Sequence, residues 1–142
     1  MDKAELPDSE LPRTAAAIGC GVIGAAWVAR LRLSGVDVHV SDPAPNAEQV
    51  LRQVMDDAVA AWDQLGLPTN RSGTLTLFDS IEEAVADTSF IQESVPERME
   101  LKRSVFSAIE AAAPVDAVIA SSTSGFRPSE LQQDMTLSLI HI

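Results

Sequence analysis

The chain has 142 residues, and with 46% hydrophobic side chains it suits a single packed domain. Its 21 acidic residues outnumber its 10 basic residues, so the formal net charge of −11 at pH 7 opposes binding to nucleic acid or to anionic lipid. A single cysteine, Cys20, excludes an internal disulfide, and we expect a small molecule as the ligand.

Residues 1–10 are acidic and polar, and they lack the basic and apolar regions of a secretory signal. No window of the chain has the length and hydrophobicity of a membrane span. We therefore expect a cytoplasmic protein with no membrane partner, in which residues 1–13 form an N-terminal tail.

From residue 14 onward, short apolar runs that suit strands alternate with stretches of helical periodicity. Strands are predicted at 14–18, 37–41, 74–78, 89–92 and 117–120. Helices are predicted over 22–33, 47–65, 81–86 and 99–113. This alternation indicates an α/β fold of the Rossmann type, a doubly wound parallel sheet between two layers of helices.

The segment after the first predicted strand is a GxGxxG turn that opens a helix. Gly19 allows the tight turn, Gly21 lets the backbone approach a pyrophosphate, and Gly24 lets the helix pack closely on the sheet. A purely structural glycine turn is the alternative. The residues predicted to bind a dinucleotide through this turn are Gly19, Cys20, Gly21, Val22, Ile23 and Gly24.

Asp42 comes directly after the second predicted strand, about twenty residues after the glycines. A carboxylate at this place accepts hydrogen bonds from the adenosine ribose hydroxyls and repels a 2′-phosphate, so NAD is favoured over NADP. Residues 43–47 contain no lysine or arginine that could neutralise such a phosphate. The alternative is that Asp42 is an ordinary turn residue before Pro43.

Two polar segments follow the fourth and fifth predicted strands, at the sheet edge where α/β folds bind ligands. Ser124 can donate a hydrogen bond to a developing alkoxide, or it is a turn or helix-cap serine. Ser122 is a weaker candidate in the same loop. Glu97 and Lys102 have structural alternatives too, as a first-turn carboxylate favoured by the helix dipole and as a solvated surface residue.

Three separated blocks resemble the 3-hydroxyacyl-CoA dehydrogenase superfamily, and within it the members that act on carnitine. The blocks are GCGVIGAAWVAR at 19–30, IQESVPERMELKR at 91–103 and ASSTSGFRPSELQQDM at 120–135. The resemblance covers nearly all of residues 15–135. Several blocks in the right order are far less expected by chance than one glycine motif.

The resemblance implies an NAD-dependent enzyme that oxidises the 3-hydroxyl of L-carnitine to the ketone of 3-dehydrocarnitine. Glu97 and Lys102 would then contact the cofactor, and Ser124 would touch both substrate and nicotinamide. It also implies a homodimer for the full-length protein. Open alternatives are a dehydrogenase for 3-hydroxyacyl-CoA or another 3-hydroxy acid, a non-catalytic module that senses NAD(H), and a methyltransferase that uses S-adenosylmethionine.

The same resemblance places a catalytic histidine and glutamate, and then a helical domain, after the next strand of the fold. The match stops at residue 136, and we expect residues 137–142 to be a non-native tail translated from a sequencing adapter. His39 lies within a predicted strand and His141 in this tail, so neither is expected to be catalytic, and no metal-ligand cluster is visible. We expect a truncated sheet with 117–120 on an open edge, which binds NAD without turnover.

Overall fold

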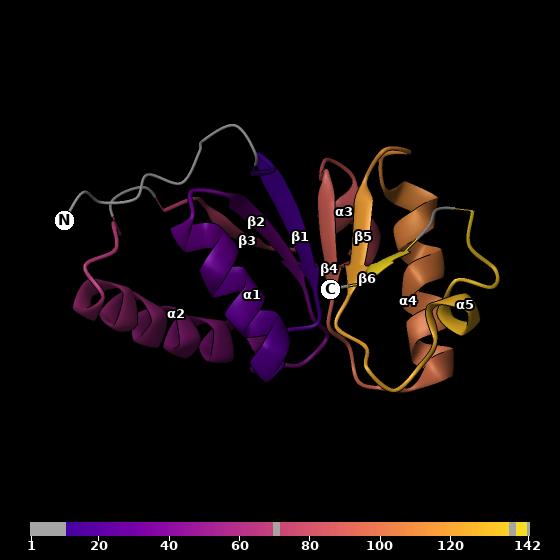
Figure 1. The fold of residues 1–142 in the computed structure, drawn as a ribbon, viewed down its shortest axis with the longest axis horizontal. Coiled ribbons are helices and arrows are strands. Elements are labelled where there is room, and N and C mark those ends of the chain that lie inside the picture. Colours follow the sequence, from indigo (N-terminus) through magenta and orange to yellow (C-terminus); the bar gives the residue numbers. More distant parts are fainter. Residues whose placement is uncertain (1–10, 70–71, 137–138, 142) are drawn as a thin grey trace.

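The computed structural model describes residues 11–69, 72–136 and 139–141, which form one six-stranded parallel sheet with helices on both faces (Figure 1). The strands are β1 (Thr14–Ile18), β2 (Asp37–Ser41), β3 (Leu75–Leu77), β4 (Phe90–Glu93), β5 (Val118–Ser121) and β6 (Leu139–His141). The helices are α1 (Val22–Leu33), α2 (Ala47–Gln64), α3 (Ile81–Val85), α4 (Met99–Ala112) and α5 (Pro128–Leu131). Within the described residues, no helix has the length and apolar character needed to cross a membrane.

The strand order is β3-β2-β1-β4-β5-β6, so the chain builds outward from β1 to β3 and then returns to the other side of β1. Helices α1 and α2 pack together on one face, whereas α3 and α4 pack on the opposite face (Figure 1). The strand order therefore reverses between β1 and β4. Doubly wound sheets bind their ligands at such a reversal, beside the carboxyl ends of the strands.

The central strand β1 is buried on both faces, and its small side chains let both helical layers approach closely. Ala15 and Ala17 lie in the hydrophobic cluster that includes α1, whereas Ala16 and Ile18 lie in the cluster that includes Phe106 of α4. None of the four β1 residues named is more than 2% exposed. The predicted Rossmann-type fold is confirmed, and each predicted strand and helix agrees with the structure to within one residue at either end.

The C-terminal part of the sheet differs from the expectation. Strand β6 pairs in parallel with residues 119–121 of β5, so the expected open edge at 117–120 is wrong. An edge strand offers a row of unpaired backbone N–H and C=O groups, and these can pair with an extended segment of almost any sequence. Helix α5 was also not predicted. Residues 137, 138 and 142 lie outside the described residues, and the non-native origin of 137–142 stays a prediction.

Candidate functional site

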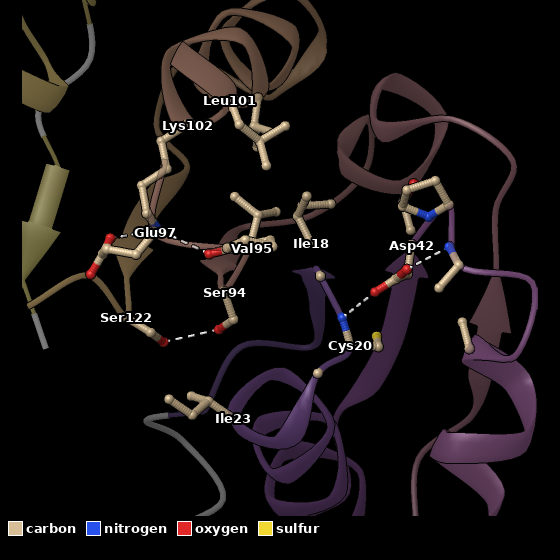
Figure 2. A pocket seen from close by; sticks show the side chains of 18 of the residues that line it. Ile18, Cys20, Ile23, Asp42, Ser94, Val95, Glu97, Leu101, Lys102 and Ser122 are labelled. Carbon is tan, nitrogen blue, oxygen red and sulfur yellow. Dashed lines mark hydrogen bonds and ion pairs between the residues drawn. The ribbon is translucent and has the colours of Figure 1, made fainter. Parts of the chain in front are cut away.

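A cavity of about 1150 Å³ opens at the carboxyl ends of β1, β2 and β4, where the strand order reverses. Its walls come from the loops after these strands, from the loop after β5 and from the N-terminal parts of α1, α2, α3 and α4 (Figure 2). The volume lies just above the range of about 300–1,000 Å³ that is common for small-molecule sites. Every predicted site residue except Gly24 lines it, namely Gly19, Cys20, Gly21, Val22, Ile23, Asp42, Glu97, Lys102 and Ser124.

Backbone geometry explains the three glycines of the loop after β1. Gly19 has a φ of +91°, and a Cβ there would lie 2.9 Å from the carbonyl of Ser94. A Cβ on Gly24 would lie 1.8 Å from the carbonyl oxygen of Gly19 and 3.3 Å from the Cβ of Ser94, which follows β4, so this glycine lets α1 pack closely on the loop and on the end of the sheet. A Cβ on Gly21 would meet no atom within 4 Å. Gly21 therefore leaves its main chain open to a ligand in the cavity.

Among the described residues, no side chain supplies an acceptor to the first turn of α1. Its N-cap residue is Gly21, no side chain caps the helix, and the turn contains no acidic residue. The amides of a first helical turn lack intrahelical acceptors, and the helix dipole favours an anion beside them. Val22 and Ile23 are exposed and line the cavity, so this end of the helix is accessible to a ligand. The loop thus has the shape and donors that a pyrophosphate requires.

Asp42 follows β2 and accepts a hydrogen bond on each carboxylate oxygen. Its Oδ1 accepts from the amide of Ala44 at 2.7 Å, which is the contact expected of a turn residue. Its Oδ2 accepts from the amide of Cys20 at 2.5 Å and ties the glycine loop to β2 (Figure 2). Burial and then the charge of Asp42 raise the pKa of the Cys20 thiol to about 12, so Cys20 is protonated at neutral pH.

Glu97 lies in the loop before α4 and is held by the loop after β5. Thr123 Oγ1 donates to Glu97 Oε1 at 2.5 Å, and the amides of Ser124 and Gly125 donate to Oε2 at 3.0 and 3.2 Å. Partial burial raises the pKa of Glu97, but these hydrogen bonds and the charge of Lys102 outweigh it and lower the pKa to about 2. Ser124 is thereby placed next to an ionised carboxylate on the cavity wall.

Lys102 is buried with 1% exposure, so its alternative role as a solvated surface residue is wrong. Its Nζ donates to Glu93 Oε1 at 2.6 Å and to the carbonyl oxygen of Val95 at 3.1 Å, and it lies 3.5 Å from Glu97 Oε1. The fully buried Glu93 also accepts from the Val95 amide at 2.8 Å and, through Oε2, from the hydroxyl of Ser121. Glu93 and Lys102 therefore form a buried ion pair that joins β4 to α4 beneath the cavity.

Glu93 was not predicted as a functional residue, although the sequence contains a signal for it. A carboxylate ends a buried apolar strand, and a lysine follows nine residues later on the next helix. Buried carboxylates require partners because an unpaired charge is strongly destabilised away from water. A charged residue that interrupts the carboxyl end of a buried strand would have been reason to search for its counter-ion.

Comparisons with known proteins agree with this geometry. The family model described as 3-hydroxyacyl-CoA dehydrogenase, NAD binding domain, matches residues 14–138. An L-carnitine dehydrogenase/betainyl-CoA thioesterase from Rhizobium sp is 54% identical over 122 residues, which are 85% of this chain and 24% of that protein. An L-carnitine dehydrogenase from Mesorhizobium japonicum is 52% identical over 124 residues, which are 85% of this chain and 34% of that protein.

A solved structure with the same fold is the 5-formyl-3-hydroxy-2-methylpyridine 4-carboxylic acid 5-dehydrogenase, described as an NAD+ dependent dismutase. It superposes with a TM-score of 0.78 at 34% identity, over 87% of this chain and 41% of that chain. The chain thus spans about a quarter to a third of the length of the two curated relatives.

Proposed function

Because the chain belongs to the family of 3-hydroxyacyl-CoA dehydrogenase NAD binding domains, we propose that it is the NAD-binding part of an enzyme that oxidises L-carnitine. The reaction converts the 3-hydroxyl of L-carnitine to the ketone of 3-dehydrocarnitine, and bound NAD+ accepts the hydride. Two relatives that share about half of their residues with this chain have carnitine dehydrogenase in their names, which supports this substrate over 3-hydroxyacyl-CoA and other 3-hydroxy acids.

The observation that carries the proposal is the open glycine loop tied to Asp42 at the reversal in strand order. In the proposed complex the pyrophosphate accepts hydrogen bonds from the amides of the first turn of α1. Each carboxylate oxygen of Asp42 has two lone pairs, and one protein amide uses one of them, so acceptor capacity remains for the adenosine ribose. The negative charge of Asp42 disfavours the 2′-phosphate of NADP.

On the other side of the cavity, Glu97 and Ser124 face the nicotinamide half of the cofactor in the proposed complex. Ser124 donates a hydrogen bond to the substrate oxygen. Glu97 Oε2 already accepts from two amides, so a contact of Glu97 with the nicotinamide nucleoside would use the remaining lone pair of Oε1. Lys102 Nζ already contacts Glu93, Val95 and Glu97, so we assign it to holding Glu97 in place rather than to binding the cofactor itself.

Removal of the hydroxyl proton requires a base that is poised near neutral pH. The imidazole Nδ1 of His39 is 3.1 Å from the carbonyl oxygen of Ala84, the ring packs on Phe78, and His39 is not among the residues that line the cavity. The two curated relatives are about three to four times as long as the matched segment, which is 24% and 34% of their lengths. Together with the resemblance, which places the catalytic histidine after the matched residues, this supports assigning the base to a part of the full-length protein beyond this chain, and we expect the 142-residue chain to bind NAD(H) without oxidising carnitine.

A homodimeric full-length protein, a cytoplasmic location and the absence of nucleic-acid and membrane partners are further proposals. The resemblance to the superfamily supports the first. The net charge of −11 supports the last, because it repels nucleic acid and anionic lipid. Size-exclusion chromatography with light scattering on the full-length protein, and fractionation of its host cells, test the assembly and the location.

The binding proposal is tested by titrating the purified chain with NADH, NADPH and S-adenosylmethionine at pH 7, after circular dichroism has verified that it is folded. We expect NADH to bind, NADPH to bind at least about tenfold more weakly, and S-adenosylmethionine not to compete. A folded chain without affinity for either oxidised or reduced NAD contradicts the proposal.

The catalytic part of the proposal requires the full-length protein. We expect it to form NADH with L-carnitine and not with 3-hydroxybutyryl-CoA, and the reverse preference contradicts the proposed substrate. A full-length protein that binds NADH and oxidises neither compound contradicts both substrates and leaves a dehydrogenase for another 3-hydroxy acid or the sensing module. Carnitine-dependent NADH formation by the 142-residue chain alone contradicts the assignment of the base to another part of the protein.

A further inference from the structure

Three polar side chains that have no role in the proposed function lie together next to the glycine loop. Gln92 of β4 is fully buried, and its Nε2 donates to Ser122 Oγ at 2.7 Å. The hydroxyl oxygens of Ser122 and Ser94 are 2.9 Å apart. Both serines line the cavity, and Figure 2 shows their side chains pointing toward one another from the loops after β5 and β4.

The backbone decides which way the amide of Gln92 points. Its Nε2 also donates to the carbonyl oxygen of Glu93 at 3.2 Å. If the amide were reversed, Oε1 would face this carbonyl oxygen, and two acceptors would oppose one another. Gln92 is therefore a donor to Ser122, although its Oε1 is left without a hydrogen-bond partner among the described residues. Ser122 Oγ consequently accepts a hydrogen bond, and its own proton points away from Gln92.

The serine pair has one more hydroxyl proton than the hydrogen bond between the two serines uses. When Ser122 donates to Ser94, the proton of Ser94 is left over. When Ser94 donates to Ser122, the proton of Ser122 is left over, because Ser122 then accepts from both neighbours. In either arrangement one hydroxyl proton has no acceptor among the described protein atoms, and both hydroxyls belong to residues of the cavity wall.

The position of the pair indicates which part of a dinucleotide it meets. The amide of Ser94 donates to the carbonyl oxygen of Ile18 at 2.8 Å, so Ser94 lies directly beside the glycine loop. Asp42 lies on the other side of β1, because β2 and β4 flank this strand. A dinucleotide with its adenosine at Asp42 and its pyrophosphate on the loop therefore extends its second nucleoside toward Ser94 and Ser122.

We propose that the Ser94–Ser122 pair, oriented by Gln92, is a binding site for an acceptor oxygen of the nicotinamide nucleoside. The acceptor is either a ribose hydroxyl oxygen or the carboxamide oxygen, since both are neutral oxygens of the same half of the cofactor. The site rests on the proposed function, because it requires that NAD(H) lies across β1. It adds Gln92 as a positioning residue and the two serines as direct contacts.

The test compares the affinities of the 142-residue chain and its Ser94→Ala/Ser122→Ala double variant for NADH, ADP-ribose and ADP by calorimetry. We expect the double variant to bind NADH roughly three- to tenfold more weakly, the range of one neutral hydrogen bond, and to bind ADP as the parent does. A similar loss for ADP-ribose assigns the contact to the ribose, whereas a loss for NADH alone assigns it to the carboxamide.

Two further variants separate binding from folding. Ser122→Thr keeps a hydroxyl and is expected to bind NADH within about twofold of the parent, less than the loss of a hydrogen bond would cause. Ser107→Ala, an exposed serine of α4 outside the cavity lining, is the matched control and is expected to change nothing. Should the double variant fail to fold, Ser94→Ala alone is measured with the same three ligands.

The proposal is overturned if a folded double variant binds NADH as tightly as the parent, or if it loses the same affinity for ADP. In both cases the parent still binds NADH, so the proposed function survives. If the folded parent binds neither NADH nor ADP-ribose, the proposed function itself is wrong and the serine pair has no nicotinamide ligand.

Discussion

The two sides of the cavity keep their shape by different means. On the β1–β2 side the wall is formed by the glycine loop and the first turn of α1, and the side chain of Asp42 ties the loop to β2. On the β4–β5 side the wall rests on side chains. Lys102 links Glu93 to Glu97, Ser121 at the end of β5 donates to Glu93, and Thr123 in the loop after β5 donates to Glu97. We therefore expect the first side to be sensitive to added volume and the second to loss of a charged partner.

The largest effect is expected from Lys102→Met on the β4–β5 side. This change leaves the carboxylate of Glu93 buried without its cation, and breaking such a pair costs about 3–5 kcal/mol of the free energy of unfolding. Urea unfolding monitored by circular dichroism measures it. The double variant Glu93→Gln/Lys102→Met removes both charges, so it should be more stable than the sum of the two single changes predicts.

Arg52→Met is the matched control, because Arg52 pairs with Glu48 at 2.9 Å on the exposed surface of α2. We expect this variant to lose no more than about 0.5 kcal/mol. If Lys102→Met lowered the free energy of unfolding no more than Arg52→Met does, the stability of the β4–β5 side would not depend on its buried ion pair.

The second effect concerns added volume on the β1–β2 side. In Gly24→Ala the new Cβ would lie 1.8 Å from the carbonyl oxygen of Gly19, so the loop must move, at a cost of about 1–3 kcal/mol. Helix propensity alone predicts the opposite sign, a gain of about 1 kcal/mol for alanine within α1. Thermal unfolding of Gly24→Ala measures the sign: a lower melting temperature indicates the steric clash, and a higher one indicates an ordinary helical position.

Gly21→Ala provides the comparison within the same loop. A Cβ at this position meets no protein atom within 4 Å. We therefore expect Gly21→Ala to be as stable as the parent and to bind NADH more weakly. A Gly21→Ala variant with unchanged NADH affinity would show that the ligand does not approach this part of the backbone.

The third effect is a change of cofactor preference in Asp42→Asn. Loss of the charge removes charge-assisted hydrogen bonds to the ribose, so NADH binding should weaken on the order of tenfold while NADPH binding improves. Titration of both cofactors measures the ratio of the two affinities. An unchanged ratio would mean that Asp42 acts only as a turn residue that accepts from Ala44 and Cys20.

The smallest effect is the pH dependence of stability due to Glu97. Its pKa is lowered from 4.5 to about 2 in the folded chain, so its stabilising contribution is full above about pH 4.5 and is lost as the pH falls toward 2. Its side chain is 41% exposed, which limits this contribution to about 1 kcal/mol or less. Urea unfolding of the parent and of Glu97→Gln should differ at pH 7 and converge near pH 2. If the two unfolding free energies differed by the same amount at every pH, the lowered pKa of Glu97 would not be the source of the stabilisation.

The order of strands and helices and the site on the β1–β2 side could be predicted from sequence, because both depend on local rules. Glycine spacing, apolar runs and one acidic residue at a strand end are visible in a window of about thirty residues. For Gly24 the structure adds a detail, since a Cβ there would meet the carbonyl of Gly19 first and then Ser94 beside the end of β4. The open edge at 117–120 was wrong because backbone pairing with residues 139–141 depends little on side chains.

By itself the sequence determined the fold class, the glycine loop and the choice of residues that line the cavity, because periodicity and short motifs act over neighbouring positions. Only the tertiary structure decided that Lys102 is buried against Glu93, that Glu97 is held by the loop after β5, and that Gln92 orients a pair of serines. These contacts join β4, β5 and α4. These contacts depend on the parallel register of the strands, which places the carboxyl ends of segments that are distant in sequence at one edge of the sheet.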